Sequence, residues 1–268
     1  MIRDITIGQY YPVDSPIHRL DPRVKLSGTM LFLISLFVFS GYLGYVIATV
    51  FVGCVIKLSK VPFRYIVRGL RPVFFLLLIT LLFNLLLTRN GEEVFSFWII
   101  HIYDEGVIMA ALMAVRLVLL VIGSSLMTFT TTPNQMTDGL EKGLGFLKKI
   151  RVPVHEIAMM MSIALRFIPI LIEETDKIMK AQQARGADFE SGRLLQRAKA
   201  LVPLLVPLFV SAFRRANDLA LAMEARCYHG GGGRTKMKPL RYQKRDAAAY
   251  LILFAYLGTV IGSGFLFR

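Results

Sequence analysis

The sequence predicts an all-α integral membrane protein with about five transmembrane helices and a cytoplasmic module of one short and two long, crossed amphipathic helices. Three observations support this fold class. Hydrophobic residues make up 55% of the 268 residues and gather in long runs, whereas soluble domains contain roughly 45–50%. The formal net charge is +14, and Lys and Arg accumulate on cytoplasmic segments of membrane proteins. Residues 131–246 carry many charges at helical spacing instead of a clean apolar run.

The first apolar run covers residues 26–56 and is too long for one span of about 20 residues. Ser40, Gly41 and Gly44 lie near its middle, so we expect two compact helices joined by a tight turn. The segment that follows contains no acidic residue and five basic ones: Lys57, Lys60, Arg64, Arg68 and Arg71. The positive-inside rule places this segment, and with it the N-terminus, in the cytoplasm.

A third span is expected at residues 72–88, where Pro72 suits the first turn of a helix. Residues 94–103 are short, aromatic and partly β-like. We expect them to form an interfacial or re-entrant piece, with Trp98 and Tyr103 at the level of the lipid headgroups.

A fourth span is expected at residues 106–129 and contains Arg116. A charge at that depth is costly. Arg116 either contacts another helix or subunit, or it snorkels from a tilted helix, and both interpretations stay open. The last span is expected at residues 247–266. It follows a run of basic residues that fixes its start in the cytoplasm, namely Arg234, Lys236, Lys238, Arg241, Lys244 and Arg245.

The module between the last two spans begins with the sequence Thr132-Pro133-Asn134-Gln135, which is typical of a capping box. It predicts a short helix that ends near Gly143 or Gly145. The chain thus divides into a membrane domain at 1–130, a helical module at 131–246 and a final span at 247–268.

Two long helices are expected in this module, over about 153–185 and 191–228, with bends at Pro169, Pro203 and Pro207. Each has one apolar face, and we expect these two faces to pack together near the membrane. Residues 230–233 are four glycines, which we interpret as a hinge.

The two long helices end alike. One reads Ala181-Gln182-Gln183-Ala184-Arg185-Gly186, and the other reads Ala222-Met223-Glu224-Ala225-Arg226-Cys227. Small residues let a helix end approach another surface, and an arginine offers a fixed fork of hydrogen-bond donors. An arginine also suits any helix C-terminus through the macrodipole, but its repetition at corresponding ends favours a docking role.

These ends resemble the two coupling motifs of the EcfT/CbiQ family, the transmembrane coupling subunits of energy-coupling factor (ECF) transporters. Residues 15–26, 213–216 and 222–230 also resemble that family, and the likeness covers essentially the whole chain. Cys227 stands where the family usually has glycine.

The resemblance implies a scaffold in the bilayer of a bacterial cell that joins two ABC-type ATPases to a membrane substrate-binding S component, for import of a vitamin or metal ion. ATP and Mg would bind the partner ATPases and no cofactor would bind this chain. The expected ATPase-docking residues are Ala184, Arg185, Gly186, Ala225, Arg226 and Cys227. Weaker candidates for S-component or intramembrane contacts are Arg116, Leu165, Ile168, Leu205 and Phe209.

The sequence argues against several other functions. It lacks a G-x-x-x-x-G-K-[ST] loop for ATP, its four histidines have no ligand spacing, and no nucleic-acid motif accompanies the charge. Two alternative classes were weighed. A membrane enzyme would need acidic metal ligands, for which only Asp138 and Glu141 qualify. A permease would need polar residues along its spans, of which Asn84 and Arg116 are the main examples.

Overall fold

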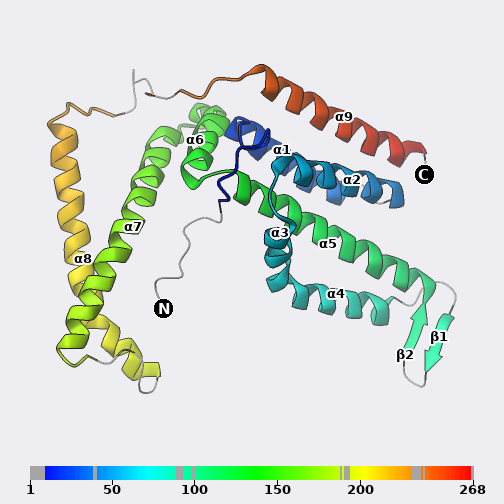
Figure 1. Ribbon diagram of the computed structural model, residues 1–268, viewed down its shortest axis with the longest axis horizontal. Coiled ribbons are helices and arrows are strands. Elements are labelled where there is room, and N and C mark those ends of the chain that lie inside the picture. Colours follow the sequence, from blue (N-terminus) through cyan, green and yellow to red (C-terminus); the bar gives the residue numbers. More distant parts are fainter. Residues whose placement is uncertain are drawn as a thin grey trace. The chain divides into compact units, whose positions relative to one another are not determined.

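The computed structural model describes residues 10–38, 41–88, 93–97, 100–187, 189, 194–230, 237 and 239–266. Its helices and strands are α1 (Pro22–Val38), α2 (Tyr42–Ser59), α3 (Phe63–Leu70), α4 (Phe74–Leu87), β1 (Glu93–Phe97), β2 (Ile100–Tyr103), α5 (Asp104–Thr130), α6 (Pro133–Gly143), α7 (Val154–Ala184), α8 (Leu194–Glu224) and α9 (Lys244–Leu266) (Figure 1). Two 3-10 helices, at Arg71–Val73 and Leu144–Ile150, connect neighbouring helices. The fold is helical apart from one short hairpin.

Residue contacts divide the chain into two units. One is Glu141–Pro239, with α7 and α8, and the other combines Gly8–Leu140 with Leu240–Arg268. The second unit therefore brings α9 back to the helices of the first half of the chain. Which parts of either unit lie in the membrane stays a prediction.

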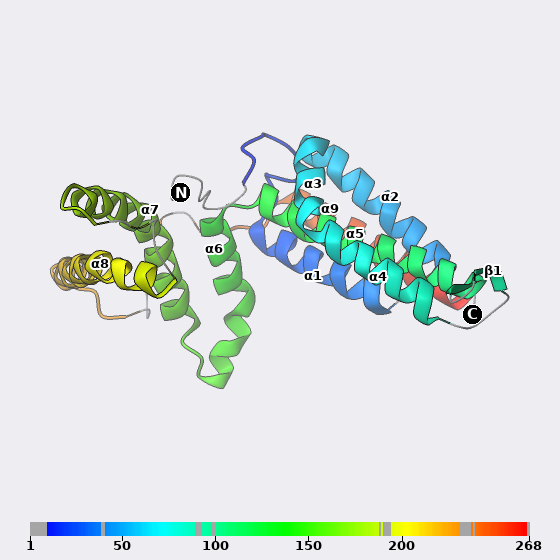
Figure 2. The same cartoon turned by 90° about the horizontal axis from the view of Figure 1, so that it is seen from below.

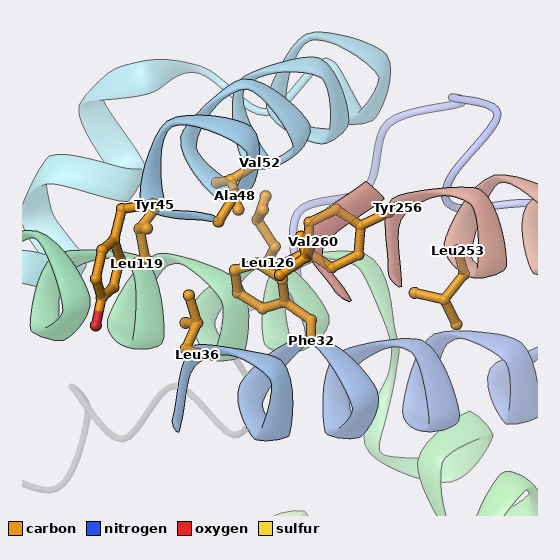
Figure 3. Packing of buried hydrophobic residues seen from close by; sticks show 10 residues of the cluster. All are labelled: Phe32, Leu36, Tyr45, Ala48, Val52, Leu119, Leu126, Leu253, Tyr256 and Val260. Atoms are coloured by element: carbon orange, nitrogen blue, oxygen red, sulfur yellow. The ribbon is translucent and has the colours of Figure 1, made fainter. Parts of the chain in front are cut away.

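Helices α1, α2, α5 and α9 run beside one another and form the packed centre of the larger unit (Figures 1 and 2). Figure 3 shows the side chains that interlock there: Phe32, Leu36, Tyr45, Ala48, Val52, Leu119, Leu126, Leu253, Tyr256 and Val260. Gly123 lets α5 approach α1 closely, because a Cβ atom there would lie 2.6 Å from the ring of Phe32. Such close packing holds helices together in lipid, where hydrophobic burial gives little driving force.

The two helices predicted in the first apolar run are present as α1 and α2, with Gly41 capping the start of α2. They fit because α1 begins at Pro22 and α2 continues to Ser59, both beyond the apolar run itself. The fourth and last predicted spans correspond to α5 and α9, and α9 begins at Lys244. These predictions are confirmed to within a few residues.

Part of the basic segment after α2 is helical, a point on which its charge pattern made no prediction. Residues Phe63–Leu70 form α3, whose Ile66 is buried against Val61 and Phe129. A 3-10 turn at Arg71–Val73 then leads directly into α4, so the third predicted span is the second half of a longer helical segment. The large side chains of α4 are exposed, as on a helix surrounded by lipid.

The short aromatic segment after α4 is a β-hairpin. Strands β1 and β2 pair antiparallel, with a register irregularity between Glu93 and Phe95. The β-like interpretation is confirmed, but its position at the membrane surface stays a prediction. Trp98 lies outside the described residues.

Five helical segments in the described part of the chain are long and apolar enough to cross a membrane: Tyr42–Ser59, Phe63–Leu87, Asp104–Thr130, Val154–Ala184 and Lys244–Gly264. The number of candidate spans agrees with the prediction, but the helices that make up the five are not the ones predicted. Helix α1 is absent because it has only 17 residues, and α7 is present although we predicted it to be a cytoplasmic amphipathic helix.

The capping box at the start of α6 is confirmed in both directions. The backbone N–H of Gln135 donates to Thr132 Oγ1 at 3.3 Å, and the N–H of Thr132 donates to Gln135 Oε1 at 3.2 Å. The helix ends at Gly143, and its Gly139 packs against Pro22 of α1. The proposed hinge at 230–233 lies outside the described residues except for Gly230.

Helices α7 and α8 contact each other, as expected, but their apolar faces are only partly covered. Met160 on α7 is 60% exposed and Phe209 on α8 is 61% exposed, whereas Leu204 is buried. The expectation that the two faces cover each other is therefore wrong for most of their length. Apolar surface of this size on a folded chain marks contact with lipid or with another protein.

Candidate functional site

The first predicted docking motif is a Schellman motif at the end of α7. The N–H of Ala187 donates to the carbonyl of Gln182 at 3.0 Å, and the N–H of Gly186 donates to the carbonyl of Gln183 at 2.9 Å. Gly186 has a φ of +89°, a conformation that glycine adopts readily. Arg185 occupies the C-cap position between the helix and this turn.

The second motif, at the end of α8, forms the same turn. The N–H of Tyr228 donates to the carbonyl of Met223 at 3.0 Å, and the N–H of Cys227 donates to the carbonyl of Glu224 at 2.8 Å. Cys227 takes the left-handed position with a φ of +53°. Arg226 therefore stands in the same position of its turn as Arg185. The sequence repeat is thus a repeat of structure.

All six predicted docking residues are exposed: Ala184, Arg185, Gly186, Ala225, Arg226 and Cys227. Neither arginine has an ion-pair partner within the part of the chain that the structure describes. Each arginine stands at the negative end of a helix dipole, and the turn satisfies backbone carbonyls of the last helical turn. Each end thus presents one cation with free donors to a partner surface.

The two helices are fixed to each other by an ion pair and a hydrogen bond that the sequence analysis did not predict. Arg215 Nη2 of α8 lies 3.0 Å from Glu174 Oε2 of α7. Gln182 Nε2 donates to the carbonyl of Pro203 at 3.2 Å. That carbonyl lacks its helical donor because the residue four positions on is Pro207, which has no N–H. The two contacts show that α7 and α8 run in opposite directions.

Tyr228, the residue after the second motif, also reaches α7. Its hydroxyl donates to Met159 Sδ at 3.0 Å. The motif at the end of α8 is therefore attached to the first half of α7, whereas Gln182 attaches the motif at the end of α7 to α8. The sequence marks only one side of these contacts. Gln182 belongs to the repeated motif, but its acceptor at Pro203 is 21 residues away and no local pattern indicates it.

Of the candidate S-component contacts, Ile168, Leu205 and Phe209 are exposed and Leu165 is partly buried. These four residues lie on α7 and α8, well before the helix ends. Ile168 is 36% exposed, Leu205 44% and Phe209 61%, so these side chains are available to lipid or a partner.

Arg116 makes an interhelical contact, which decides between the two interpretations left open above. Its Nε donates to Tyr45 Oη of α2 at 2.7 Å, and its guanidinium carbon lies 5.6 Å from the centres of the Tyr45 and Phe37 rings. Aromatic faces and a hydroxyl offset the cost of a charge deep in a bundle. Arg116 thus joins α5 to α1 and α2, which supports the interpretation as an interhelical contact over that of a snorkelling side chain.

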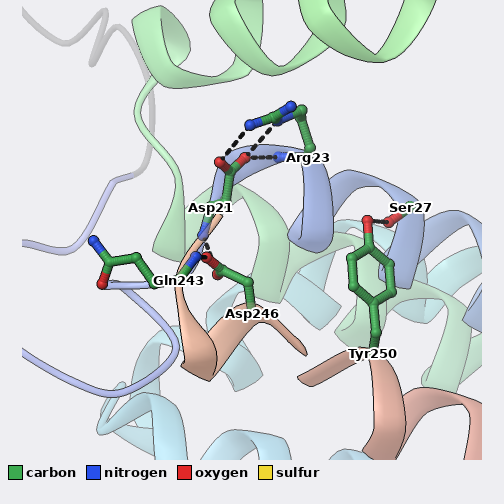
Figure 4. A network of polar contacts seen from close by, with 6 residues as sticks. All are labelled: Asp21, Arg23, Ser27, Gln243, Asp246 and Tyr250. Atoms are coloured by element: carbon green, nitrogen blue, oxygen red, sulfur yellow. Dashed lines mark hydrogen bonds and ion pairs between the residues drawn. The ribbon is translucent and has the colours of Figure 1, made fainter. Parts of the chain in front are cut away.

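A polar network holds the N-terminal segment against the start of α9 (Figure 4). The carboxylate of Asp21 accepts two bonds from the guanidinium of Arg23, and its backbone N–H donates to Asp246 Oδ1 at 2.9 Å. Asp246 also accepts the N–H of Gln243, which caps α9. Asp21 and Asp246 lie 225 positions apart in the sequence, so no local pattern pairs them.

The same end of the bundle also holds His18 and Lys25. Lys25 Nζ donates to the carbonyls of His18 and Thr130, at 3.1 and 2.8 Å. His18 Nε2 donates to the carbonyl of Tyr11 at 3.0 Å, and Nδ1 accepts from Ser15 Oγ at 2.7 Å. Burial lowers the pKa of His18 below its ordinary value, so this imidazole is held neutral.

The two candidates for a membrane enzyme do not form a metal site in the described residues. Glu141 Oε1 lies 2.9 Å from Nδ1 of His155 at the start of α7. No group of three or more His, Cys, Asp or Glu residues comes together anywhere in the described part of the chain. The permease candidate Asn84 donates to the carbonyl of Thr80 within its own helix.

The arrangement defines a multi-pass helical membrane protein with two exposed, matching helix ends. Comparison with known proteins then gives the family. Residues 14–238 match the family described as CbiQ, cobalt transport protein. A relative from Clostridium kluyveri, named energy-coupling factor transporter transmembrane protein EcfT, is 57% identical over 252 residues, which cover 94% of this chain and 93% of the relative.

Two further relatives carry the same name. The one from Bacillus subtilis is 47% identical over 94% of this chain and 96% of its own length, and the one from Lactococcus lactis is 48% identical over 92% of each. The chain therefore belongs to the EcfT/CbiQ family of ECF transporter transmembrane proteins, as its N-terminal segment and its repeated helix ends predicted.

Proposed function

We propose that this chain is the membrane-embedded scaffold of an ECF-type ABC importer. It transmits the ATP-driven motion of two ATPase subunits to a membrane S component that takes up a vitamin or a metal ion. The chain itself is not catalytic, and ATP and Mg bind the ATPases. The observation that carries this proposal is the pair of matching Schellman turns, each presenting an exposed arginine.

A pair of matching docking ends suits a pair of ATPases related by a two-fold axis. Each ATPase would take one arginine, Arg185 or Arg226, into an acidic or carbonyl-lined groove. Closure of the ATPase pair would draw the two ends together. Because α7 and α8 are fixed to each other by polar contacts, the movement would pass along both helices to their exposed apolar faces. There Ile168, Leu205 and Phe209 would meet the S component.

Co-purification tests the docking step. The tagged chain is expressed with candidate ATPase subunits as wild type and as the double variant Arg185→Glu with Arg226→Glu, and the ATPases retained in detergent are quantified. The control is Arg166→Glu with Arg214→Glu, which places the same charge change on exposed positions of α7 and α8 away from their ends. The proposal expects retention by the wild type and the control and loss in the double variant.

Other outcomes have distinct meanings. Equal retention by all three proteins would remove the docking role from these arginines while keeping the partners. No retention by the wild type would remove the scaffold proposal. The single variants then show whether both ends are needed, because one remaining end should hold one ATPase weakly.

A further inference from the structure

A cavity of about 190 Å³ opens among α1, α2, α5, α9 and the N-terminal segment. It is larger than the roughly 150 Å³ cavity that accommodates benzene in a protein core. Its walls are apolar apart from Lys25, Thr29 and Thr130. Lys25 Nζ and Thr130 Oγ1 are already bonded to backbone carbonyls. The cavity therefore suits hydrocarbon better than a polar ligand.

Small residues keep the cavity open. Gly28 lies in its wall on α1, and a Cβ atom there would meet only Leu253 Cδ2, at 3.9 Å. A larger side chain at this position would enter open space. The opposite wall includes Val55 of α2, so the cavity can be filled experimentally from two different helices.

The cavity continues into a second hollow whose wall also includes charged residues. The two share five apolar residues, namely Ile17, Leu20, Leu58, Ala249 and Ile252. The second hollow adds Arg19, Lys60, Arg245 and one carboxylate, Asp14. Arg19 is paired with Asp14.

Lys60 and Arg245 have no carboxylate partner among the described residues. Lys60 caps the end of α2, and Arg245 lies in the first turn of α9. Both side chains are exposed. Arg245 is bonded to the neutral side chain of Gln243. The hollow thus presents two cations that form no ion pair within the described residues, and its one carboxylate, Asp14, is paired with Arg19.

We propose that the joined hollows bind one anionic phospholipid, with an acyl chain in the apolar cavity and the phosphate between Lys60 and Arg245. A free anion would leave the apolar cavity unfilled, and an uncharged hydrocarbon would leave the two cations without a negative partner. An amphiphile with a negative headgroup satisfies both parts. Such lipids surround a multi-pass membrane protein, and Lys and Arg near the end of a span attract them.

The site includes no residue of α7 or α8 and does not depend on the proposed coupling function. It is formed by the two ends of the larger unit's sequence, since α1 and α2 come first in the chain and α9 comes last. A bound lipid would therefore join α9 to α1 and α2.

Native mass spectrometry of the purified full chain tests the site, with phosphatidylglycerol and phosphatidylcholine of identical acyl chains as probes. We expect one phosphatidylglycerol per chain, held at about tenfold lower concentration than phosphatidylcholine. Lys60→Asn with Arg245→Gln should remove this preference, and asparagine tolerates the left-handed φ of +56° at position 60. The control Lys57→Asn with Lys244→Gln removes two exposed neighbouring charges outside the hollow and should keep it.

The acyl-chain half is tested separately. Gly28→Leu and Val55→Phe should each abolish the one-to-one complex by filling the cavity. Gly53→Leu is the control and should keep the complex, because Gly53 is an exposed residue of α2 where an added Cβ atom would meet no other atom within 4 Å. Circular dichroism melting checks that each variant is folded. Because the two cavity-filling substitutions lie on different helices, the test still stands if one of the two variants does not fold. Equal binding of the two lipids by the wild type, or unchanged binding in both filled variants, would overturn the proposal.

Discussion

The two docking turns carry different residues at the left-handed position, and this difference predicts opposite responses to substitution. Gly186 has a φ of +89°, outside the range of about +50° to +70° in which other residues adopt the left-handed conformation. Cys227 has a φ of +53°, inside that range. Gly186→Ala should therefore destabilise its turn, and Cys227→Gly should stabilise its own.

The magnitudes follow from backbone conformation alone, because a Cβ atom at Gly186 would meet no other atom within 4 Å. A left-handed residue with a Cβ costs roughly 1–2 kcal/mol. The alanine regains about 0.4–1 kcal/mol by restricting the unfolded chain. The net loss for Gly186→Ala is therefore about 1 kcal/mol. Cys227→Gly should gain about 0.5 kcal/mol by the same reasoning in reverse.

Amide hydrogen exchange reports these changes locally. The bonds to watch are the N–H groups of Ala187 and Tyr228, which close the two turns at 3.0 Å each. A loss of about 1 kcal/mol should speed exchange at Ala187 about fivefold, since 1.4 kcal/mol is a factor of ten. Exchange at Tyr228 should slow about twofold in Cys227→Gly.

The control is Gly143→Ala, at the last residue of α6, where the backbone is helical. Alanine stabilises a helical position by about 0.5–1 kcal/mol relative to glycine, so Gly143→Ala should raise local stability whereas Gly186→Ala lowers it. Unchanged exchange at Ala187 in Gly186→Ala, or faster exchange at Tyr228 in Cys227→Gly, would refute the conformational reasoning.

Three further predictions follow from single contacts. Gln182→Ala should lower the stability of the α7–α8 contact by about 1 kcal/mol in the wild type. It should cost much less beside Pro207→Ala, which restores a helical donor to the freed carbonyl, and a double-mutant cycle on thermal unfolding measures the difference. Tyr45→Phe should cost about 1–3 kcal/mol by leaving the Arg116 guanidinium without its hydroxyl acceptor, seen as a lower Tm in detergent. Because the pKa of His18 is lowered by burial, the unfolded chain takes up a proton first. Stability should fall as the pH drops below about 6.5, and His18→Gln should remove that part of the pH dependence in melts between pH 7.5 and 5.

The helices could be predicted from the sequence because their signals are local. The apolar runs gave α1, α2, α4, α5 and α9 to within a few residues. The Thr132 and Gln135 pair gave the start of α6 through bonds between residues three apart. The ends of α7 and α8 were visible because a Schellman turn needs a small or flexible residue at one fixed position.

The tertiary contacts could not be predicted, because they join residues that are distant in the sequence. No local pattern pairs Asp21 with Asp246, or Arg116 with Tyr45. No backbone structure was predicted for the basic segment after α2, for a different reason. Its five positive charges indicate a side of the membrane, and this signal says nothing about whether the backbone is helical, as α3 shows.

The contact between α7 and α8 shows how a helix-breaking residue can serve a two-helix element. Pro207 removes one hydrogen bond from α8, and this loss leaves the carbonyl of Pro203 open to Gln182. An uninterrupted α8 would have no such acceptor, and the polar contacts between the two helices would be the ion pair of Arg215 with Glu174 and the bond from Tyr228 to Met159. A partly exposed ion pair alone contributes little. A second contact, one helical turn from the docking arginine, therefore gives the proposed coupling element the stiffness it needs, because a pull on Arg185 acts on α8 as well as on α7.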